Sequence, residues 1–183
     1  MSNITKKAIA MSLKKIMQNK PLDKITVKEI TADCGVNRQT FYYHFTDIFK
    51  LIEWIFKEEA IENISEYKSY ATWQKGFLMI FEYVKVNLKF CTNCFNSAGR
   101  DYLERFLYSA TFDLLYGVVI EVAGDRNIKD EDLGFIANFY TYAFIGIMAS
   151  WIRNKANEDP SKIINDINRL IEGDIYKAIK NNS

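Results

Sequence analysis

Apolar residues recur every three or four positions along most of the chain, which is the spacing of helices with one buried face. The first such stretch covers residues 4–18, where Ile4, Ala8 and Met11 share a face among lysines. The same spacing predicts further helices over residues 48–67, 73–87, 88–96, 100–122, 130–157 and 160–180. The 8 Gly and 2 Pro are few for the frequent turns of a β-rich chain. Together with two short helices near the N-terminus, the pattern predicts an all-α fold of about nine helices.

Capping signals mark those two short helices. Thr26 followed by Glu29 forms a capping box, which predicts that a helix begins at Thr26. Gly35 is suited to end that helix, because glycine readily adopts the left-handed conformation found after a helix C-terminus. Asn37 can then cap a third helix over residues 38–45. A helix, a tight glycine turn and a second helix make up the helix-turn-helix motif.

The third helix is predicted to have two different surfaces. Phe41 and Phe45 are four residues apart, and we expect them to face a small core with Ile30 and Val36. Polar residues line the outer side and both ends of this helix: Arg38, Gln39, Thr40, Tyr42, Tyr43 and His44. Such side chains suit a DNA major groove, where Arg pairs with guanine, Gln pairs with adenine and Tyr or His donates to phosphates. A solvated polar face is the alternative for a stretch this short.

The charge distribution favours DNA over that alternative. The formal net charge is only +1. Residues 1–50 hold nine Lys or Arg and four Asp or Glu, a balance of +5, whereas the remainder holds 15 and 19, a balance of −4. A basic segment on an acidic body is typical of contact with nucleic acid or an anionic membrane. We therefore expect a DNA-binding domain over residues 1–48 and a separate helical body over residues 49–183.

The motif resembles the DNA-binding signature of TetR-family transcriptional regulators. The resemblance lies in residues 25–30 (ITVKEI) and 34–45 (CGVNRQTFYYHF). Residues 50–56 (KLIEWIF) and the body after them are similar to the subgroup that contains regulators of dihydroxyacetone kinase operons. The resemblance implies a cytoplasmic homodimer that binds a palindromic operator in double-stranded DNA and responds to a small-molecule effector.

The resemblance also implies roles for single residues in the first fifty or so positions. Bases would be read by Arg38, Gln39 and Thr40. The full set of expected DNA-binding residues is Thr26, Lys28, Asn37, Arg38, Gln39, Thr40, Tyr42, Tyr43, His44 and Lys50. One position departs from the family pattern, because Ile48 stands where the family usually has a phosphate-binding lysine. Lys50 lies two residues further on, about 200° around a helix, so it can replace the missing charge only if the helix starts differently.

In the body, the resemblance implies an interface and a cavity. Family members dimerise through their last two long helices, and small residues there allow close helix approach. The expected interface residues are Ala143, Gly146, Ser150, Ile163, Ile167 and Ile171. Aromatic residues fall on the helices that enclose the effector cavity in the family, although packing in the core explains them equally: Trp73, Phe77, Phe81, Phe95, Tyr108, Phe112, Tyr140 and Phe144.

Residues 133–152 carry no charge, and twenty such residues are the length of a membrane span. Polar residues such as Asn138, Thr141 and Ser150 interrupt the stretch, and its flanks show no positive-inside bias. A helix buried within a protein has the same composition. We therefore expect no membrane association.

The few cysteines and the single histidine narrow the remaining chemistry. Three cysteines and a polar start indicate a reducing, cytoplasmic setting rather than a disulfide framework. Cys91 and Cys94 lack further partners for a zinc site, but a thiol-sensing regulator stays an alternative, as does control by a protein partner. His44 is the only histidine and lies in the DNA-binding motif, so we expect no enzyme, no metal and no cofactor.

Overall fold

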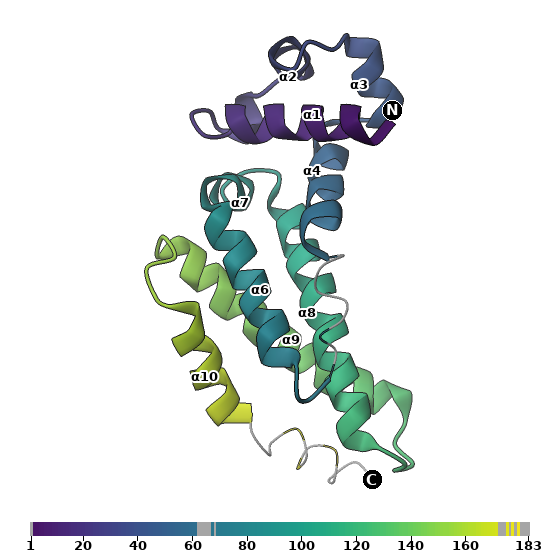
Figure 1. Cartoon of the computed structure of the whole chain (residues 1–183). Coiled ribbons are helices and arrows are strands. Elements are labelled where there is room, and N and C mark those ends of the chain that lie inside the picture. The colour runs from purple at the N-terminus through teal and green to yellow at the C-terminus, as the bar shows by residue number, and fades with distance from the viewer. Residues whose placement is uncertain are drawn as a thin grey trace. The chain divides into compact units, whose positions relative to one another are not determined.

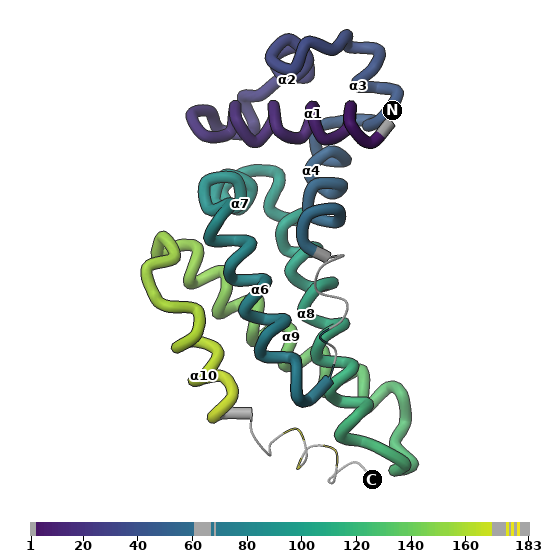
Figure 2. The backbone as a smooth tube through the Cα atoms, viewed as in Figure 1, coloured from purple at the N-terminus to yellow at the C-terminus, as the bar shows by residue number. Residues whose placement is uncertain are grey.

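The computed structural model describes residues 2–61, 67, 69–171, 175, 177 and 179. Within these residues the chain forms nine α-helices, one short 3-10 helix and one π-helical turn, and no strand (Figures 1 and 2). In chain order they are α1 (Ser2–Ile16), η1 (Leu22–Lys24), α2 (Val27–Asp33), α3 (Arg38–His44), α4 (Ile48–Phe56), η2 (Lys57–Ile61), α6 (Trp73–Val86), α7 (Leu88–Phe95), α8 (Arg100–Ala123), α9 (Asp130–Arg153) and α10 (Pro160–Ile171). The predicted all-α fold is confirmed.

Two helix ends differ from the prediction. The helix expected over residues 48–67 is α-helical only to Phe56 and continues as the π-helical turn η2, while residues 62–66 lie outside the described part. The helix expected to reach residue 157 ends at Arg153. Lys155 and Ala156 follow it with φ of 57° and 54°, a left-handed conformation that stops an α-helix. The helix that begins at Pro160 is expected to end near residue 180. This end lies outside the described residues, because beyond residue 171 only 175, 177 and 179 are described.

The chain divides into two compact units. The first unit comprises residues 1–59 and 87–106, and the second comprises residues 60–86 and 107–183. Helix α8 therefore gives its first residues to the first unit and the rest to the second. The functional boundary expected between residues 48 and 49 stays a prediction.

The core of the first unit forms where α1 packs on α2 and α4, and where α2 packs on α3 (Figure 1). Leu13 of α1, Ile30 of α2 and Phe41 of α3 are fully buried. Ser12 is also buried, and its hydroxyl donates to the Ile30 carbonyl at 2.9 Å. This hydrogen bond satisfies a polar group that would be costly to bury alone.

Three aromatic rings extend this core to α4, α7 and α8. Phe56 of α4 stacks on Phe106 of α8, with ring centroids 4.7 Å apart. Phe90 of α7 lies 5.3 Å from the Phe56 ring. Because all three are buried, α4 shares an apolar core with helices from much later in the sequence.

Asn93 of α7 joins that helix to the segment between α1 and α2. Its side-chain amide donates to the carbonyls of Lys20 at 2.7 Å and Met17 at 3.2 Å. Its carbonyl oxygen accepts from the Leu22 amide at 2.7 Å. One side chain thus satisfies three backbone groups of a non-helical turn, where such groups otherwise lack partners.

The turn between α7 and α8 covers the same segment. Leu22 is buried, and a Cβ placed on Gly99 would lie only 2.7 Å from its Cδ2 atom. The Ala98 amide donates to the Asp23 carboxylate at 3.3 Å. A side chain at position 99 would therefore require the buried Leu22 side chain to move.

In the second unit, α6 lies against α10 and shares an aromatic core with α9. Ile80, Phe81 and Val84 of α6 are fully buried. From α9, Met148 and Trp151 are buried as well. Helices α8 and α9 are both long and apolar enough to cross a membrane by length and composition, but core helices meet the same test. The expected absence of membrane association stays a prediction.

Replacing Asn93 is expected to destabilise the first unit. Asn93→Ala removes three hydrogen bonds and should lower the free energy of unfolding by about 1–3 kcal/mol. Asn93→Asp should cost more, because a carboxylate oxygen would face two carbonyl oxygens. Thermal unfolding measures both losses, and hydrogen exchange at the Leu22 amide should accelerate in both variants.

Asn96 provides the matched control, since it lies at the end of the same helix and is exposed. Asn96→Ala should leave both stability and Leu22 exchange near the wild-type values. Equal effects at positions 93 and 96 would contradict a specific role for the Asn93 amide.

Candidate nucleic-acid interface

The predicted helix-turn-helix is formed, with each predicted cap in place. The Thr26 hydroxyl accepts from the Glu29 amide at 3.3 Å, and the Glu29 carboxylate accepts from the Thr26 amide at 2.9 Å. Gly35 follows α2 with φ of 71°, the left-handed conformation that the turn requires. Asn37 then caps α3, accepting from the Thr40 amide at 2.7 Å. Local sequence signals therefore fix the angle at which α3 leaves the turn.

Glu29 is held in its charged form by its surroundings. Its carboxylate accepts hydrogen bonds from the Lys20 ammonium and from Thr26, which together lower its pKa from 4.5 to about 2. The carboxylate is charged at neutral pH, so the capping box and its link to Lys20 persist there.

Helix α3 has one buried face and one exposed face. Phe41 is fully buried, whereas Gln39 is exposed and Tyr43 is 83% exposed. Arg38 lies over the ring of Tyr42 at 5.6 Å and donates to its hydroxyl at 3.3 Å. The exposed face therefore presents a guanidinium, an amide and two phenols, the groups that hydrogen-bond to base edges and phosphates.

The other predicted DNA-binding residues occupy differing settings. Lys28 is exposed on α2, and His44 is half-buried at the end of α3. Thr40 is half-buried, and its hydroxyl donates to the Asn37 side chain at 2.9 Å. Lys50 is paired with Glu53 at 2.7 Å, and that carboxylate raises the Lys50 pKa. The predicted DNA-binding residues thus all lie on the helix-turn-helix or on α4. The side chains of two of them, Thr26 and Asn37, act as helix caps.

A pocket of about 360 Å³ near the end of α3 contains basic residues that sequence reasoning missed. It is lined by Lys6, His44, Phe45, Thr46, Lys50, Glu53, Trp54 and Lys57. Lysines surround the first helix at several positions, so no sequence signal singles out Lys6. The packing of α1 against α4 accompanies the placement of Lys6 in the same pocket lining as His44.

The exposed face of α9 bears an apolar stripe along the predicted interface. Phe135, Phe139 and Tyr142 are 72%, 63% and 65% exposed. Ala143 and Gly146 continue this stripe, and a Cβ added at Gly146 would meet no atom within 4 Å. No described atom of the same protomer therefore covers this face of α9 at Gly146.

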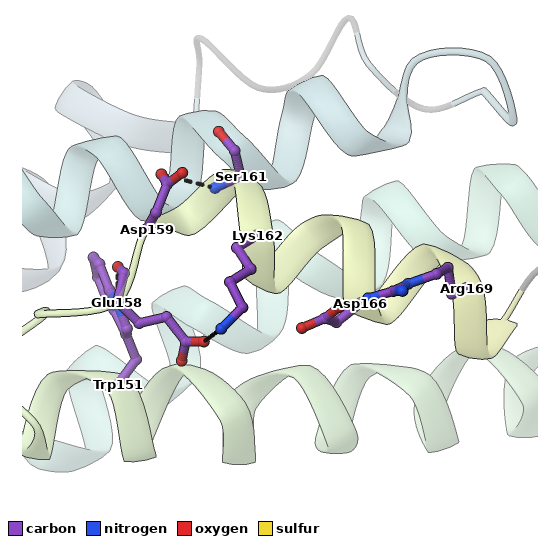
Figure 3. A network of polar contacts seen from close by, with 7 residues as sticks. All are labelled: Trp151, Glu158, Asp159, Ser161, Lys162, Asp166 and Arg169. Atoms are coloured by element: carbon purple, nitrogen blue, oxygen red, sulfur yellow. Dashed lines mark hydrogen bonds and ion pairs between the residues drawn. The ribbon is translucent and has the colours of Figure 1, made fainter.

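A groove of about 790 Å³ between α9 and α10 contains Ser150, Ile163 and Ile167 of the predicted interface. Ile163 is buried within its own unit, Ile167 is half-buried, and the side chain of Ile171 lies outside the described residues. The loop from α9 to α10 is tied by the Trp151 indole, which donates to the Glu158 carbonyl at 2.9 Å (Figure 3).

Further polar contacts continue along the start of α10 in Figure 3. Glu158 pairs with Lys162 at 3.2 Å, and Asp159 accepts from the Ser161 amide at 3.2 Å. Asp166 and Arg169 form another pair one turn further on. The first two contacts lie where the loop enters α10, and the last lies within α10.

Four of the predicted effector residues form a packed cluster in the second unit. Phe77 lies edge-to-face against Phe144 with ring centroids 4.1 Å apart, and against Trp73 at 5.4 Å. Phe81 also packs on Phe144, at 5.5 Å. All four are at most 3% exposed, so they form core in this structure.

The remaining predicted effector residues lie elsewhere. Tyr108 stacks on Phe112 at 5.6 Å and hydrogen-bonds to Asn138 at 2.5 Å, beside an open pocket of about 710 Å³. Tyr140 is half-buried on α9. Phe95 belongs to the first unit, where the Arg100 guanidinium lies 4.7 Å from its ring. The structure does not bring the eight residues into one cavity within its described part.

The two cysteines of α7 are buried. Burial raises the pKa of Cys91 well above its usual value and that of Cys94 to about 12. Both thiols therefore keep their protons at neutral pH and are poor nucleophiles, which weakens the thiol-sensing alternative. No cluster of three or more His, Cys, Asp or Glu suited to a metal lies in the described ranges.

Comparisons with known proteins match both halves of the chain. Residues 13–53 match the family described as "Bacterial regulatory proteins, tetR family", and residues 71–173 match "Transcriptional regulator C-terminal region". A similar protein is the HTH-type dhaKLM operon transcriptional activator DhaS of Lactococcus lactis, which is 30% identical over 80% of this chain and 78% of its own.

Solved structures show the same likeness. The dihydroxyacetone kinase operon activator DhaS has a TM-score of 0.73 at 27% identity, covering 94% of this chain and 96% of its own. NalD of Pseudomonas aeruginosa, the secondary repressor of a multidrug efflux pump, has a TM-score of 0.67 at 14% identity, covering 97% of each chain, which shows the fold alone. The chain belongs to the TetR family of transcriptional regulators, and within that family it is similar to the dihydroxyacetone kinase operon activator DhaS.

Proposed function

We propose that this regulator is a homodimer that binds a palindromic operator through α3 of each subunit. The observation that carries the proposal is the polar face of α3, which is exposed on a fully capped helix-turn-helix. Helix α3 has only seven residues, so one copy can contact few base pairs. Two copies on successive major grooves, about 34 Å apart, supply the missing contacts.

Within each half-site, the proposed roles follow from side-chain chemistry and exposure. Arg38, Gln39 and Thr40 read bases, while Lys28 and His44 contact phosphates. Tyr42 holds the Arg38 guanidinium on the outer face of α3 before DNA arrives. Such pre-organisation lowers the entropy lost when the arginine binds a base.

The proposed dimer interface is the apolar stripe of α9 together with the groove beside α10. Exposed aromatic side chains in a continuous row are typical of protein interfaces. A second copy would bring an identical stripe, as two-fold symmetry requires. Open space at Gly146 supports close approach of the partner's helix.

The proposed signal is a small molecule bound by the second unit, which changes the separation of the two DNA-binding motifs. The ligand must bind one separation more tightly than the other to have any effect. The packed cluster around Phe77 and Phe144 supports a second candidate, control by a protein partner, because close packing leaves little room for a ligand there. Native mass spectrometry of freshly purified protein distinguishes a retained small molecule from none.

The operator is best sought by selection from a random DNA library. The similarity to an activator of a dihydroxyacetone kinase operon supports testing the region upstream of such an operon as well. A selected palindrome would support the proposed dimer, and the genes beside it would indicate the signal. The proposal places the protein in the cytoplasm and assigns it no enzymatic activity.

The base-reading and phosphate-binding residues should respond differently to substitution. Arg38→Ala should weaken operator binding by about 1–3 kcal/mol per half-site and relax the preference at one base pair. Lys28→Ala should weaken operator and unrelated DNA alike, and should reduce the slope of log affinity against log salt by about one per lost contact. Fluorescence anisotropy at several salt concentrations measures both effects. Wild-type affinity in both variants would refute the assignment.

The dimer proposal is tested by a charge on the exposed stripe. Phe139→Glu should leave the protomer folded, because the side chain is exposed, but should shift the protein to monomer and lower operator affinity. Val86→Glu is the matched control, since Val86 is 84% exposed on α6 of the same unit. Sedimentation velocity reports the outcome, and a Phe139→Glu variant that stays dimeric would place the interface elsewhere.

A further inference from the structure

The pocket at the end of α3 combines residues from three helices of the first unit. Lys6 comes from α1, His44 from the last turn of α3, and Lys50, Trp54 and others from α4 and the turns around it. Its volume of about 360 Å³ exceeds that of one phosphate group. The predicted phosphate-binding residue His44 forms part of its wall, so the pocket adjoins the proposed DNA surface.

The charges in this pocket are not equivalent. Lys50 and Glu53 pair at 2.7 Å, so their charges offset each other. Asp47 is engaged as the cap of α4, where its carboxylate accepts from the Lys50 amide at 2.8 Å. The lining then retains the ammonium groups of Lys6 and Lys57 with no further carboxylate among its residues. The pocket is therefore positively charged.

Lys6 is held in place by its neighbours. Its ammonium lies 5.9 Å from the centre of the Trp54 ring, within the range of a cation–π interaction. Nearby, Asn3 of α1 donates to the Glu58 carboxylate at 3.3 Å, which attaches the start of α1 to the turn after α4. The Lys6 ammonium therefore lies near Trp54, in the lining of the pocket that His44 also lines.

The residue at position 48 bears on the role of the Lys6 charge in phosphate binding. The first residue of α4 is a half-buried isoleucine, which offers no charge to a phosphate. We propose that Lys6 binds a backbone phosphate of the operator at this pocket, together with His44, in place of a lysine at position 48. This inference rests on the proposed function, because it assumes that α3 binds DNA.

The test compares two neighbouring lysines of α1. Lys6→Gln removes the charge and keeps a polar side chain, whereas Lys7→Gln removes an exposed charge outside the pocket. Lys6→Gln should weaken operator and unrelated DNA by the same factor, about fivefold to tenfold at low salt, and should reduce the salt slope by about one. Lys7→Gln should change the slope by much less.

A rescue variant separates phosphate binding from a structural role. Ile48→Lys in the Lys6→Gln background should restore the salt slope, because it places a charge at the start of α4. A wild-type slope in Lys6→Gln, an equal loss in Lys7→Gln, or no rescue by Ile48→Lys would each overturn the inference. Failure of the proposed function looks different, since Arg38→Ala would then leave operator affinity unchanged as well.

Discussion

Three hydrogen bonds from the Asn93 side chain fix the chain that leads into the DNA-binding motif. The segment between α1 and α2 is too short and irregular to pair its own backbone groups fully. Asn93 supplies a donor to Met17 and Lys20 and an acceptor to Leu22. Since α2 begins soon after this segment, the position of the motif depends on α7, a helix about seventy residues further along the chain.

That dependence has a consequence for regulation. Helix α7 and the first residues of α8 belong to the same compact unit as α1 to α4. Phe56, Phe90 and Phe106 join them through one apolar core. Packed cores deform poorly, so a displacement of α7 would carry the segment at Leu22 with it. The chain passes between the two units at three points, after residue 59, between α6 and α7, and within α8, so a signal received in the second unit has three covalent routes to the first.

Local signals made the DNA-binding motif predictable from sequence. The capping box at Thr26, the left-handed Gly35 and the cap at Asn37 each depend on residues at most three positions apart. The Asn93 contacts and the pocket at Lys6 were not predictable, because they join residues that are distant in sequence. The effector residues show the same limit, since an aromatic repeat on a helix is compatible with either a cavity wall or a core. Around Phe77 the side chains are packed as core in this structure, and their predicted role in effector binding stays a prediction.

The uncharged stretch of helix α9 has one side buried in the protein and one side exposed. This stretch has the length of a membrane span, yet Leu133, Met148 and Trp151 pack within the second unit. The opposite side carries exposed Phe139 and other aromatic residues, whose hydration is unfavourable. In the proposed homodimer, a second copy would cover the exposed stripe while each protomer keeps its own core, so a composition near that of a membrane span does not require a membrane.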